Sequence, residues 1–418
     1  MTVPVLPPEL PSDLTPHLSV DLFIAGGGMV GMTLGIVAAR AGISVVVADR
    51  EQPATQLAPP FDGRASAIAY GTKRMLETAG IWPELAAEAE PILEIRVSEE
   101  RSPLFLHYDH AELGDEPLGW MLENRFIRRG LHAVAARTAN LTVLAPAAVT
   151  MVERGPVFAT ATLADGRRVR AALVVAADGV RSSLREAAGI PVTRHDYGQT
   201  AIVVTVEHDL PHNNIAHEHF RAPGPFAILP LRGNRASLVW TERTAVAPGL
   251  LALDDANFDI ELGRRFGDFL GAVRATGPRW SYPLQLSHAR RYSDTRLVLA
   301  GDAAHGLHPL AGQNLNLGFR DVAALVELIV DARRLGRDIG DPDILADYEK
   351  WRRVDNTTLI AVTHSLNRLF SNDIAHVKLA RGLGLAAVNR VPPLKKMLMQ
   401  HARGTTGMLP RLLRGEAL

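Results

Sequence analysis

The sequence predicts an α/β fold in which strand–turn–helix units build a parallel sheet, a mixed β-sheet is inserted between them, and helices complete the C-terminal region. Three observations predict this architecture. Short apolar strands end on Gly or Asp at three distant places, near residues 26, 178 and 302. A helical pattern follows each of these ends. Runs of strands without helices separate the second unit from the third.

The first unit has an apolar strand at 21–25, a helix of small residues at 33–40 and a second buried strand at 44–48. The turn before the helix has the pattern GxGxxG, with glycines Gly26, Gly28 and Gly31. These glycines permit a tight turn, the approach of a pyrophosphate and close helix packing, while Asp49 after the second strand accepts from a ribose hydroxyl. The unit predicts a Rossmann-type site for an ADP-containing dinucleotide and does not decide between NAD and FAD.

The second and third units lie far along the chain. A buried strand at 172–177 ends on Asp178-Gly179, and another at 297–300 ends on Gly301-Asp302. In open α/β sheets the ligand lies beyond the carboxyl ends of such strands. Three strand ends without a second GxGxxG favour one extended ligand over a separate nicotinamide domain.

The loop after the third strand identifies that ligand. It leads into an amphipathic helix near Gly312, where the N–H groups of Gly312, Gln313 and Asn314 form a helix N-terminus that attracts negative charge. Asp302 presents a short carboxylate for polyol hydroxyls. A flavin needs both features, because its ribitol lies beside a ring that becomes anionic on reduction. The segment therefore favours FAD over an ordinary strand–loop–helix connection.

Three phrases of the chain carry a resemblance to a known family. They are GDAAHGLHPLAGQNLNLGFRDVAAL from Gly301, DGRASAIAYGTKRMLETAGIWPEL at 62–85 and NRVPPLKKMLMQHARG at 389–404. The chain resembles the class A FAD-dependent aromatic hydroxylases, the group of p-hydroxybenzoate hydroxylase, and most closely their ubiquinone-biosynthesis branch. The resemblance extends from about residue 21 to about residue 404. The chain departs from the branch at Asn314, where Gly is usual, and we expect the turn to persist because Asn tolerates positive φ.

The resemblance implies a reaction. We expect one non-covalent FAD, NAD(P)H as a transient reductant, and O2 that reacts through a flavin C4a-hydroperoxide with the ring of a polyprenyl-phenol from ubiquinone biosynthesis. Such chemistry needs a dry, apolar pocket and no catalytic triad, so no catalytic residue is assigned. Two alternatives stay open: a hydroxylase of a soluble aromatic acid, and a catalytically idle flavoprotein that scaffolds other quinone-pathway enzymes.

The expected cofactor site combines the motif residues with basic positions that the resemblance implies. Its residues are Gly26, Gly28, Gly31, Asp49, Arg50, Arg64, Arg125, Asp178, Gly179, Gly301, Asp302, Gly312, Asn314 and Leu315. Arg64 and Arg125 could equally be surface arginines. Near the flavin ring we expect Pro309, Gly312, Gln313 and Asn314.

Other polar and aromatic residues are candidates for the substrate pocket or for metal binding. Candidate lining residues, each also compatible with simple core, are Tyr197, Phe226, Leu229, Trp240 and Pro309. The group of His212, His217, Glu218 and His219 fits a solvated sheet face better than a metal site. His305 and His308 have no third ligand, so capping or hydrogen bonding is expected of them. We therefore expect no metal site.

Composition agrees with a cytoplasmic enzyme. Lys plus Arg and Asp plus Glu both number 45, so no nucleic-acid partner is expected. The chain has no cysteine, which excludes disulfides and a cysteinyl-flavin bond. The first basic residue is Arg40, which fits neither a signal peptide nor a mitochondrial presequence.

The domains are expected to interleave. We expect a disordered arm at 1–18, a FAD-binding domain in three parts, a substrate domain in two parts and a C-terminal helical region. The FAD-binding parts are 19–92, 118–194 and 289–342, the substrate parts are 93–117 and 195–288, and the helical region is 343–418. Helices are expected at 65–79 and 125–138, and a long one from Pro342. Its apolar stripe is Ile344, Tyr348, Trp351, Val354, Ile360 and Leu366.

The C-terminal segment 377–418 is basic and apolar, with Glu416 as its single acid. Such a segment lies on an anionic membrane surface, docks on a partner or packs on its own core. On the first two interpretations, truncation after Asn389 leaves flavin binding intact. These interpretations place the enzyme in the cytoplasm, with peripheral contact at the inner face of the membrane.

Overall fold

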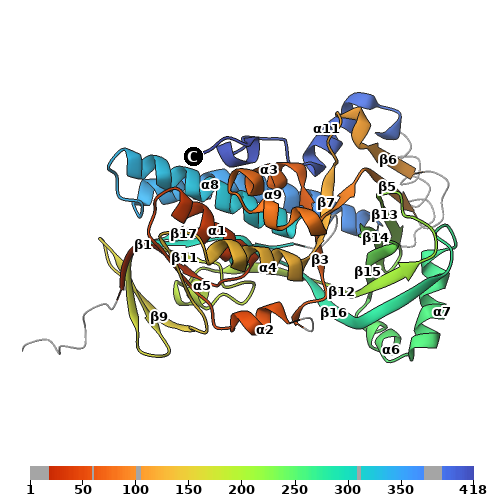
Figure 1. The fold of residues 1–418 in the computed structure, drawn as a ribbon, viewed down its shortest axis with the longest axis horizontal. Helices are drawn as coiled ribbons and strands as arrows, with labels where there is room; N and C mark the ends of the chain where they lie inside the picture. Colours follow the sequence, from red (N-terminus) through yellow and green to blue (C-terminus); the bar gives the residue numbers. More distant parts are fainter. Residues whose placement is uncertain (1–17, 59–60, 100–104, 308–311, 371–387) are drawn as a thin grey trace, which may run out of the picture.

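The computed structural model describes residues 18–58, 61–99, 105–307, 312–370 and 388–418. The expected arm at 1–18 lies outside these residues except for Leu18, which begins β1. His308 and Pro309 also lie outside them. Figure 1 shows two sheets side by side along the long axis of the molecule, with α8 and α9 beside the first sheet.

The first sheet has the strand order β17-β18-β11-β1-β2-β8. The pairs from β18 to β8 are parallel, whereas β17 is antiparallel, as are β9 and β10 beyond β11. The strands are β1 (Leu18–Ala25), β2 (Val45–Ala48), β8 (Leu141–Leu144), β9 (Val149–Arg154), β10 (Ala159–Leu163), β11 (Arg168–Ala176), β17 (Ser293–Asp294) and β18 (Leu297–Leu299).

Helices cover this sheet, which explains why strands such as β2 are apolar at every position and buried on both faces. The helices of this half are α1 (Met29–Arg40), α2 (Pro53–Leu57), α4 (Asn124–Ala135), α5 (Ser183–Ala187), α8 (Asn314–Arg334) and α9 (Pro342–Phe370). Tyr348 of α9 is fully buried and its hydroxyl donates to the carbonyl of Leu299 at the end of β18. The predicted α/β class is confirmed.

The second sheet is mixed, in the order β19-β16-β12-β15-β14-β13-β5-β6. Its strands are β5 (Glu94–Glu99), β6 (Phe105–Asp109), β12 (Val192–His208), β13 (Ile215–Arg221), β14 (Gly224–Leu231), β15 (Arg235–Arg243), β16 (Val273–Ala289) and β19 (His305–Gly306). One face packs against α6 (Ala247–Leu251) and α7 (Asp255–Phe266), which lie outside the sheet in Figure 1. We call this the outer face and the opposite one the inner face.

A three-stranded sheet joins the two halves and corrects one expectation. It has the order β3-β7-β4, with β3 (Ala65–Ala69), β7 (Gly119–Glu123) and β4 (Glu90–Ile92). The helix expected at 65–79 is therefore a strand followed by α3 (Tyr70–Thr78). The alanines of β3 favour a helix locally, but pairing with β7 from Ala65↔Glu123 to Ala69↔Gly119 overrides that preference.

The stripe expected on α9 is also partly wrong. Ile344 and Tyr348 are buried, but Val354 is 68% exposed. Arg352 and Asn356 are buried instead, because they belong to the hydrogen-bonded network described below. The helix therefore turns a polar face inward at its centre.

The described part of the C-terminal segment packs on the protein's own core. It forms α11 (Pro392–Ala402) and the short 3-10 helix η8 (Arg411–Arg414), and η8 contributes Leu412 and Leu413 to the main core. Arg411 pairs with Asp331 of α8. This packing agrees with the third interpretation of the segment, in which it packs on its own core. In the described ranges no helix is long and apolar enough to cross a membrane. The other 3-10 helices are η3 (Trp82–Glu84), η4 (Ala86–Glu88), η5 (His110–Glu112) and η6 (Gly301–Ala303).

Candidate flavin site

Four parallel strands of the first sheet end on one line. The register pairs Ala48 of β2 with Ala25 of β1, Ala25 with Ala176 of β11, and Ala176 with Leu299 of β18. The three acids expected from the sequence follow these ends within three residues. The structure therefore brings together Asp49, Asp178 and Asp302, at the edge where an α/β sheet binds its ligand.

The glycines of the first turn serve different purposes. Gly26 has φ +104°, and a Cβ there would lie 2.3 Å from the carbonyl oxygen of Ala177. A Cβ on Gly31 would lie 1.9 Å from the carbonyl oxygen of Gly26. Both positions thus need glycine for the fold itself. Gly28, the N-cap of α1 with φ −65°, has nothing within 4 Å of such a Cβ. The space beside it suits a group that approaches the helix N-terminus.

Asp49 fixes the same turn from the next strand. Its carboxylate accepts hydrogen bonds from the backbone N–H groups of Gly27 at 2.6 Å and Glu51 at 2.7 Å. Arg50, expected at this site, has a side chain that is 75% exposed and lies 3.6 Å from Glu51. In this structure Asp49 therefore organises the turn, and Arg50 is a surface residue beside it.

Asp178 has a polar atom without a partner. Its Oδ2 accepts long bonds of 3.4 Å from the Ser183 hydroxyl and the Leu184 N–H, but Oδ1 is buried and accepts none. Gly179 next to it has φ +84°, which favours glycine. Native structures rarely leave a buried carboxylate oxygen unsatisfied. A ligand donor such as a hydroxyl group would satisfy it.

Gly301 and Asp302 form the third strand end. Gly301 has φ +60°, and a Cβ there would lie 3.2 Å from both methyl carbons of Val30 on α1. Asp302 is exposed at its side chain, yet the protein around it raises its pKa through desolvation, while the charges of His305 and Arg64 act in the opposite direction. Asp302 is therefore an accessible acceptor at the line of strand ends.

The N-terminus of α8 differs in detail from the expectation. The positive φ lies at Gly312 (+61°), whereas Asn314 is the first helical residue and does not need it. Asn314 instead donates from Nδ2 to the carbonyl of Leu307 (2.8 Å) and accepts its N–H (3.1 Å). The Asn in place of the usual Gly thus closes the loop by a reciprocal pair. The N-cap, Gln313, makes no side-chain capping bond, and Leu315 packs against the main core.

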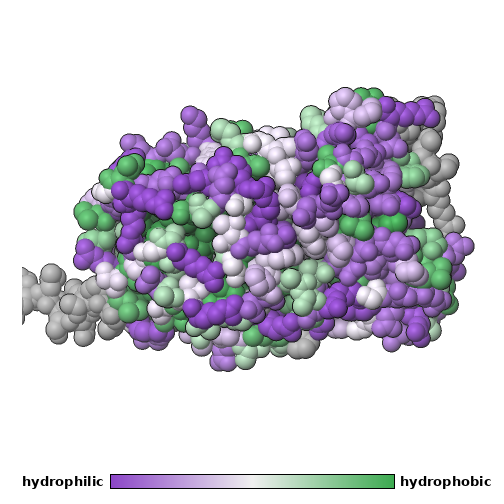
Figure 2. Space-filling view, turned by 45° about the horizontal axis from the view of Figure 1, so that its top comes forward, coloured by the Kyte–Doolittle hydropathy of each residue, from purple (hydrophilic) through white to green (hydrophobic). Residues whose placement is uncertain are grey.

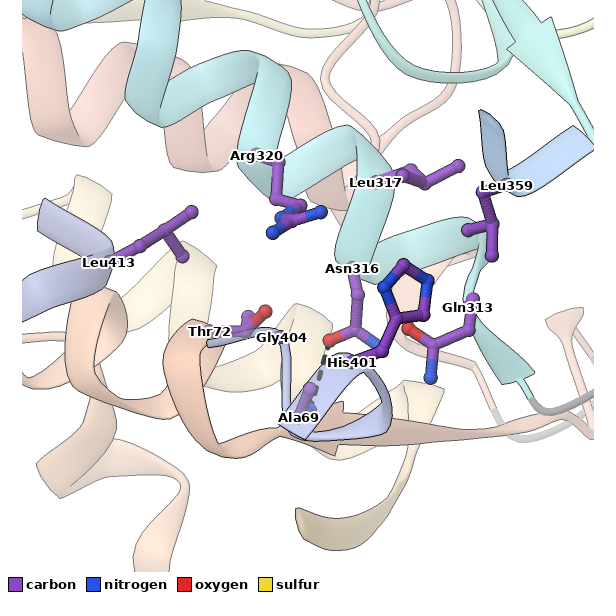
Figure 3. A pocket seen from close by; sticks show the side chains of 10 residues that line it. All are labelled: Ala69, Thr72, Gln313, Asn316, Leu317, Arg320, Leu359, His401, Gly404 and Leu413. Carbon is purple, nitrogen blue, oxygen red and sulfur yellow. Dashed lines mark hydrogen bonds between the residues drawn. The ribbon is translucent and has the colours of Figure 1, made fainter. Parts of the chain in front are cut away.

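Asn316 joins this helix to β3 and was missed by the sequence analysis. Its Oδ1 accepts the N–H of Ala69 at 3.0 Å, drawn dashed in Figure 3, and its Nδ2 donates to the carbonyl of Ala67 at 2.8 Å. Figure 3 also shows that Gln313 and His401 line the same pocket, so the C-terminal segment lies directly behind the first turn of α8. The N-terminus of α8 is thus positioned by three segments that are distant in sequence: β3, the residues that precede α8, and the C-terminal segment.

A buried charge network supports the strand end and the loop from behind. Asp321 of α8 accepts the N–H of Gly301 at 3.0 Å and the Nε of Arg352 at 2.7 Å. Its third partner is Nε2 of His305, which must be the donor because an ionised carboxylate only accepts. Burial alone would raise the pKa of Asp321, but His305 and Arg352 outweigh it and lower the pKa to about 2. His305 is thus a positioning partner, as its expected hydrogen-bonding role requires.

A second cluster surrounds Asp62, which the sequence analysis also missed. Asp62 is bound by Arg64 through Nε at 2.9 Å and Nη2 at 3.0 Å, by Arg128 and by Asn124 at 3.0 Å. Burial opposes ionisation, but these donors, Arg64 first, lower the pKa of Asp62. Arg64 also stacks over Tyr282 of β16, 4.8 Å from the ring centroid. Arg64 therefore lies between the two sheets and near enough to Asp302 for their charges to interact.

Arg125, the other basic candidate, lies at the start of α4. Its Nε is 2.9 Å from a carboxylate oxygen of Glu123, and its guanidinium lies 4.5 Å from the ring centroid of Phe126. The side chain is 40% exposed. Arg125 is thus held at the end of β7, on the strand that pairs with β3.

The candidate lining residues separate into two groups. Phe226 and Trp240 belong to the core between the second sheet and α7, so they do not line a pocket on the inner face. Leu229 packs on the inner face beside Ala65 and Ala67 of β3, and Tyr197 packs beside Leu307.

The histidines of β13, His217 and His219, are only partly exposed, so this face is less solvated than expected. His217 lies on the outer face, 4.8 Å from the ring of Phe269, and burial lowers its pKa to about 3. His219 pairs with the Ser98 hydroxyl at 2.8 Å. Among the residues that the structure describes, no three His, Asp or Glu side chains are grouped to hold a metal ion.

These features fit an elongated, partly anionic cofactor. The glycine turn leaves room at a helix N-terminus, a buried carboxylate oxygen of Asp178 lacks a donor, Asp302 is an accessible acceptor, and α8 begins without a side-chain cap. Residues 19–362 match the FAD binding domain family. Ubiquinone hydroxylase UbiL of Rhodospirillum rubrum is 55% identical over 95% of this chain and 93% of its own length.

The chain belongs to the FAD-dependent aromatic hydroxylases, in their ubiquinone-biosynthesis branch. A second relative in this branch, 3-demethoxyubiquinol 3-hydroxylase of Escherichia coli, is 33% identical over 92% of this chain and 98% of its own. Among solved structures, p-nitrophenol 4-monooxygenase PnpA from Pseudomonas putida shares the fold, with a TM-score of 0.79, 18% identity, and coverage of 94% and 100%. The expected family and cofactor are confirmed.

Proposed function

We propose that this FAD-dependent monooxygenase hydroxylates the aromatic ring of a polyprenyl-phenol intermediate of ubiquinone biosynthesis, with NAD(P)H and O2. The observation that carries the proposal is the 55% identity to a ubiquinone hydroxylase over 95% of the chain. The in-register strand ends support it, because they assemble the acids and glycines of one extended site.

We assign the cofactor to the residues at that edge. Gly28 at the N-terminus of α1 would hold the pyrophosphate, and Asp49 would hold the ribose. Asp178 and Asp302 would accept hydrogen bonds from hydroxyl groups of the cofactor, and the N–H groups at the start of α8 would stabilise the negative charge of the reduced ring. The domain division given above, with FAD bound by the interrupted parallel sheet and substrate by the mixed sheet, is part of this proposal.

The bound flavin supplies reduction by NAD(P)H and activation of O2. The residues of this chain exclude water from the site and position the elements around it. The inner face of the second sheet offers apolar side chains such as Leu229 and Ala216, which exclude water. Asp321 and Asn316 hold the loop and the helix N-terminus against this face. In this proposal no side chain acts as nucleophile.

We also propose that the outer side of α11 contacts the membrane surface that holds a polyprenylated substrate. Val391, Leu394 and Met397 are 38–53% exposed there, beside the charged Lys396. On the face shown in Figure 2, hydrophilic residues separate the hydrophobic ones, so such contact would be peripheral. Replacing these three residues by Ser should reduce binding to anionic vesicles and leave FAD content unchanged. Unchanged vesicle binding would favour a partner enzyme at this surface or no contact.

The lipid extract of a deletion strain tests the proposed function. A strain without this gene, and without a redundant hydroxylase, should lose ubiquinone, accumulate an under-hydroxylated intermediate and recover with the wild-type gene. Asp302→Ala should restore little, because it removes a proposed acceptor for the cofactor. Normal ubiquinone in the deletion strain would favour a soluble aromatic acid as substrate. Full restoration by an Asp302→Ala protein that lacks flavin would favour a scaffold.

A further inference from the structure

Strand β13 presents different side chains to the two faces of the second sheet. Side chains alternate along a strand, and directly paired residues share a face. His217 pairs with Ile228, and His219 with Phe226, both in the outer core against α7. Glu218, between the two histidines, therefore points to the inner face.

The neighbours of Glu218 on that face are apolar. It pairs with Ala227 of β14 and with Val97 of β5, and Ala227 pairs in turn with Val239 of β15. One step back along β13, Ala216 packs with Ala65 and Ala67 of β3. The residues paired directly with Glu218 are thus apolar, while Glu99, which pairs with Phe220, is a second acid on this face.

This surface lies beside the flavin site. Ala67 accepts a hydrogen bond from Asn316 of α8, and its Cβ is 3.5 Å from the point where a Cβ on Gly312 would lie. The α8 N-terminus, β3 and the inner face at Ala216 are therefore successive layers. Glu218 is two residues from Ala216 on the same face, next to the layer that touches the flavin loop.

The described part of the chain offers the Glu218 carboxylate no polar partner. No hydrogen bond or ion pair joins its carboxylate to another residue in the described ranges, and burial alone raises its pKa to about 7. Glu242, on the outer face of the same sheet, is by contrast within 3.6 Å of Arg265. The Glu218 side chain is partly exposed, so a donor from a ligand can reach its carboxylate.

A second polar group on the inner face also lacks a partner. Thr241 of β15 pairs with Ala201 and thus lies one step along the sheet from Val239, on the same face. Its side chain is 3% exposed and its hydroxyl has no hydrogen-bond partner. Two strands thus place polar groups on the inner face, a partly exposed carboxylate at Glu218 and a buried hydroxyl at Thr241, which suits a ring that carries polar substituents.

Resting on the proposed function, we propose that Glu218 binds the phenolic hydroxyl of the substrate ring as a hydrogen-bond acceptor, with Thr241 as a second polar contact on the same face. A neutral phenol satisfies the carboxylate, whereas an aromatic acid would place a second negative charge near it. Glu218 thereby selects uncharged prenylphenols over aromatic acids.

The test combines a change in the ligand with a change in the residue. Holoenzyme is titrated with a phenol that carries one isoprene unit ortho to the hydroxyl, and with its methyl ether, while the flavin absorbance spectrum reports binding. Wild type should bind the phenol about tenfold more tightly than the ether, a difference of ~1.4 kcal/mol. In Glu218→Leu the ratio should fall to about one. In Glu207→Leu, an exposed acid of the same sheet, the ratio should stay at the wild-type value.

A second variant covers the case in which Leu disturbs the sheet. Glu218→Gln keeps the shape but removes the charge, so it should bind an ortho-prenylated 4-hydroxybenzoate at least tenfold more tightly than wild type does. An unchanged phenol-to-ether ratio in a flavin-loaded Glu218→Leu protein, or unchanged binding of the acid by Glu218→Gln, overturns the role of Glu218. If wild type instead binds neither phenol nor ether but hydroxylates the acid, the proposed substrate class itself is wrong.

Discussion

The carboxylate of Asp321 accepts a hydrogen bond of 3.0 Å from the backbone N–H of Gly301, 20 residues earlier in the chain. The same carboxylate binds Arg352 of α9 and His305. One buried side chain of α8 therefore connects the end of β18, the start of the flavin loop and the long C-terminal helix. The position of the α8 N-terminus relative to the strand ends depends on this connection.

Asp321→Asn should destabilise the protein by about 3 kcal/mol. The amide leaves the buried guanidinium of Arg352 without its fully buried charge partner and presents only one acceptor oxygen. Urea unfolding at pH 7 measures the loss. Asp331→Asn on the same helix is the control, because Asp331 is 49% exposed and its pairing with Arg411 should contribute less than about 1 kcal/mol. Equal effects of the two variants would contradict the importance of the network.

The difference between wild type and Asp321→Asn should depend on pH. The pKa of Asp321 is lowered to about 2 in the folded protein, below its ordinary value of 3.8. A lowered folded pKa means that the stabilisation is complete above about pH 4 and is lost as the pH falls towards 2. Unfolding free energies at pH 7, 5 and 3 should show a constant difference between 7 and 5 and a smaller one at 3. A difference that grows as the pH falls would contradict the assignment.

Gly28→Ala and Gly31→Ala should separate cofactor binding from folding. At Gly31 the new Cβ would lie 1.9 Å from a backbone oxygen, so folding itself should suffer. At Gly28 the space is open and φ is −65°, so thermal stability of the apoprotein should change by less than about 1 kcal/mol while FAD affinity falls at least tenfold. Gly263→Ala in α7 is a matched control that should leave FAD affinity unchanged and stabilise the fold by up to about 1 kcal/mol, because Ala favours a helix. Full FAD affinity in Gly28→Ala would contradict the proposal that the pyrophosphate binds at this turn.

Leu413→Ala should show that the C-terminal segment belongs to the core. Leu413 is 1% exposed and packs in the main core, so its truncation should cost about 3 kcal/mol. Met408→Ala, five residues earlier in the same segment but 80% exposed, should cost less than about 0.5 kcal/mol. Thermal unfolding of both variants measures this. If both variants lost little stability, the segment would instead be interpreted as a surface that contacts a membrane or a partner.

Much of the fold could be predicted because its signals are local. A Gly or Asp follows each of three apolar runs, at Gly26, Asp178 and Gly301. Each run is therefore predicted to be a buried strand that ends there. The same local reasoning failed at β3, where alanines resemble a helix until β7 pairs with them. It also failed on α9, where Arg352 and Asn356 are buried only because Asp321 and Tyr292 lie opposite them.

The sequence predicted the site residues that lie next to strand ends, but not those that act through partners distant in sequence. The residues that follow strand ends were found, whereas Asp62, Asn316 and Asp321 act through partners that are distant in sequence. Glu218 was hidden between two histidines, because three consecutive polar residues do not reveal which face is buried. Strand alternation combined with the apolar neighbours Ala216 and Phe220 provides the signal that could have found it.

The most direct test of the account is the source of the oxygen atom in the product. Wild-type protein loaded with FAD is supplied with NAD(P)H, a prenylated phenol and isotopically labelled O2, and the product is analysed by mass spectrometry. We expect one labelled oxygen atom on the aromatic ring of the product. Label that enters from water, or NAD(P)H consumption that yields only hydrogen peroxide with every prenylated phenol tried, would contradict it.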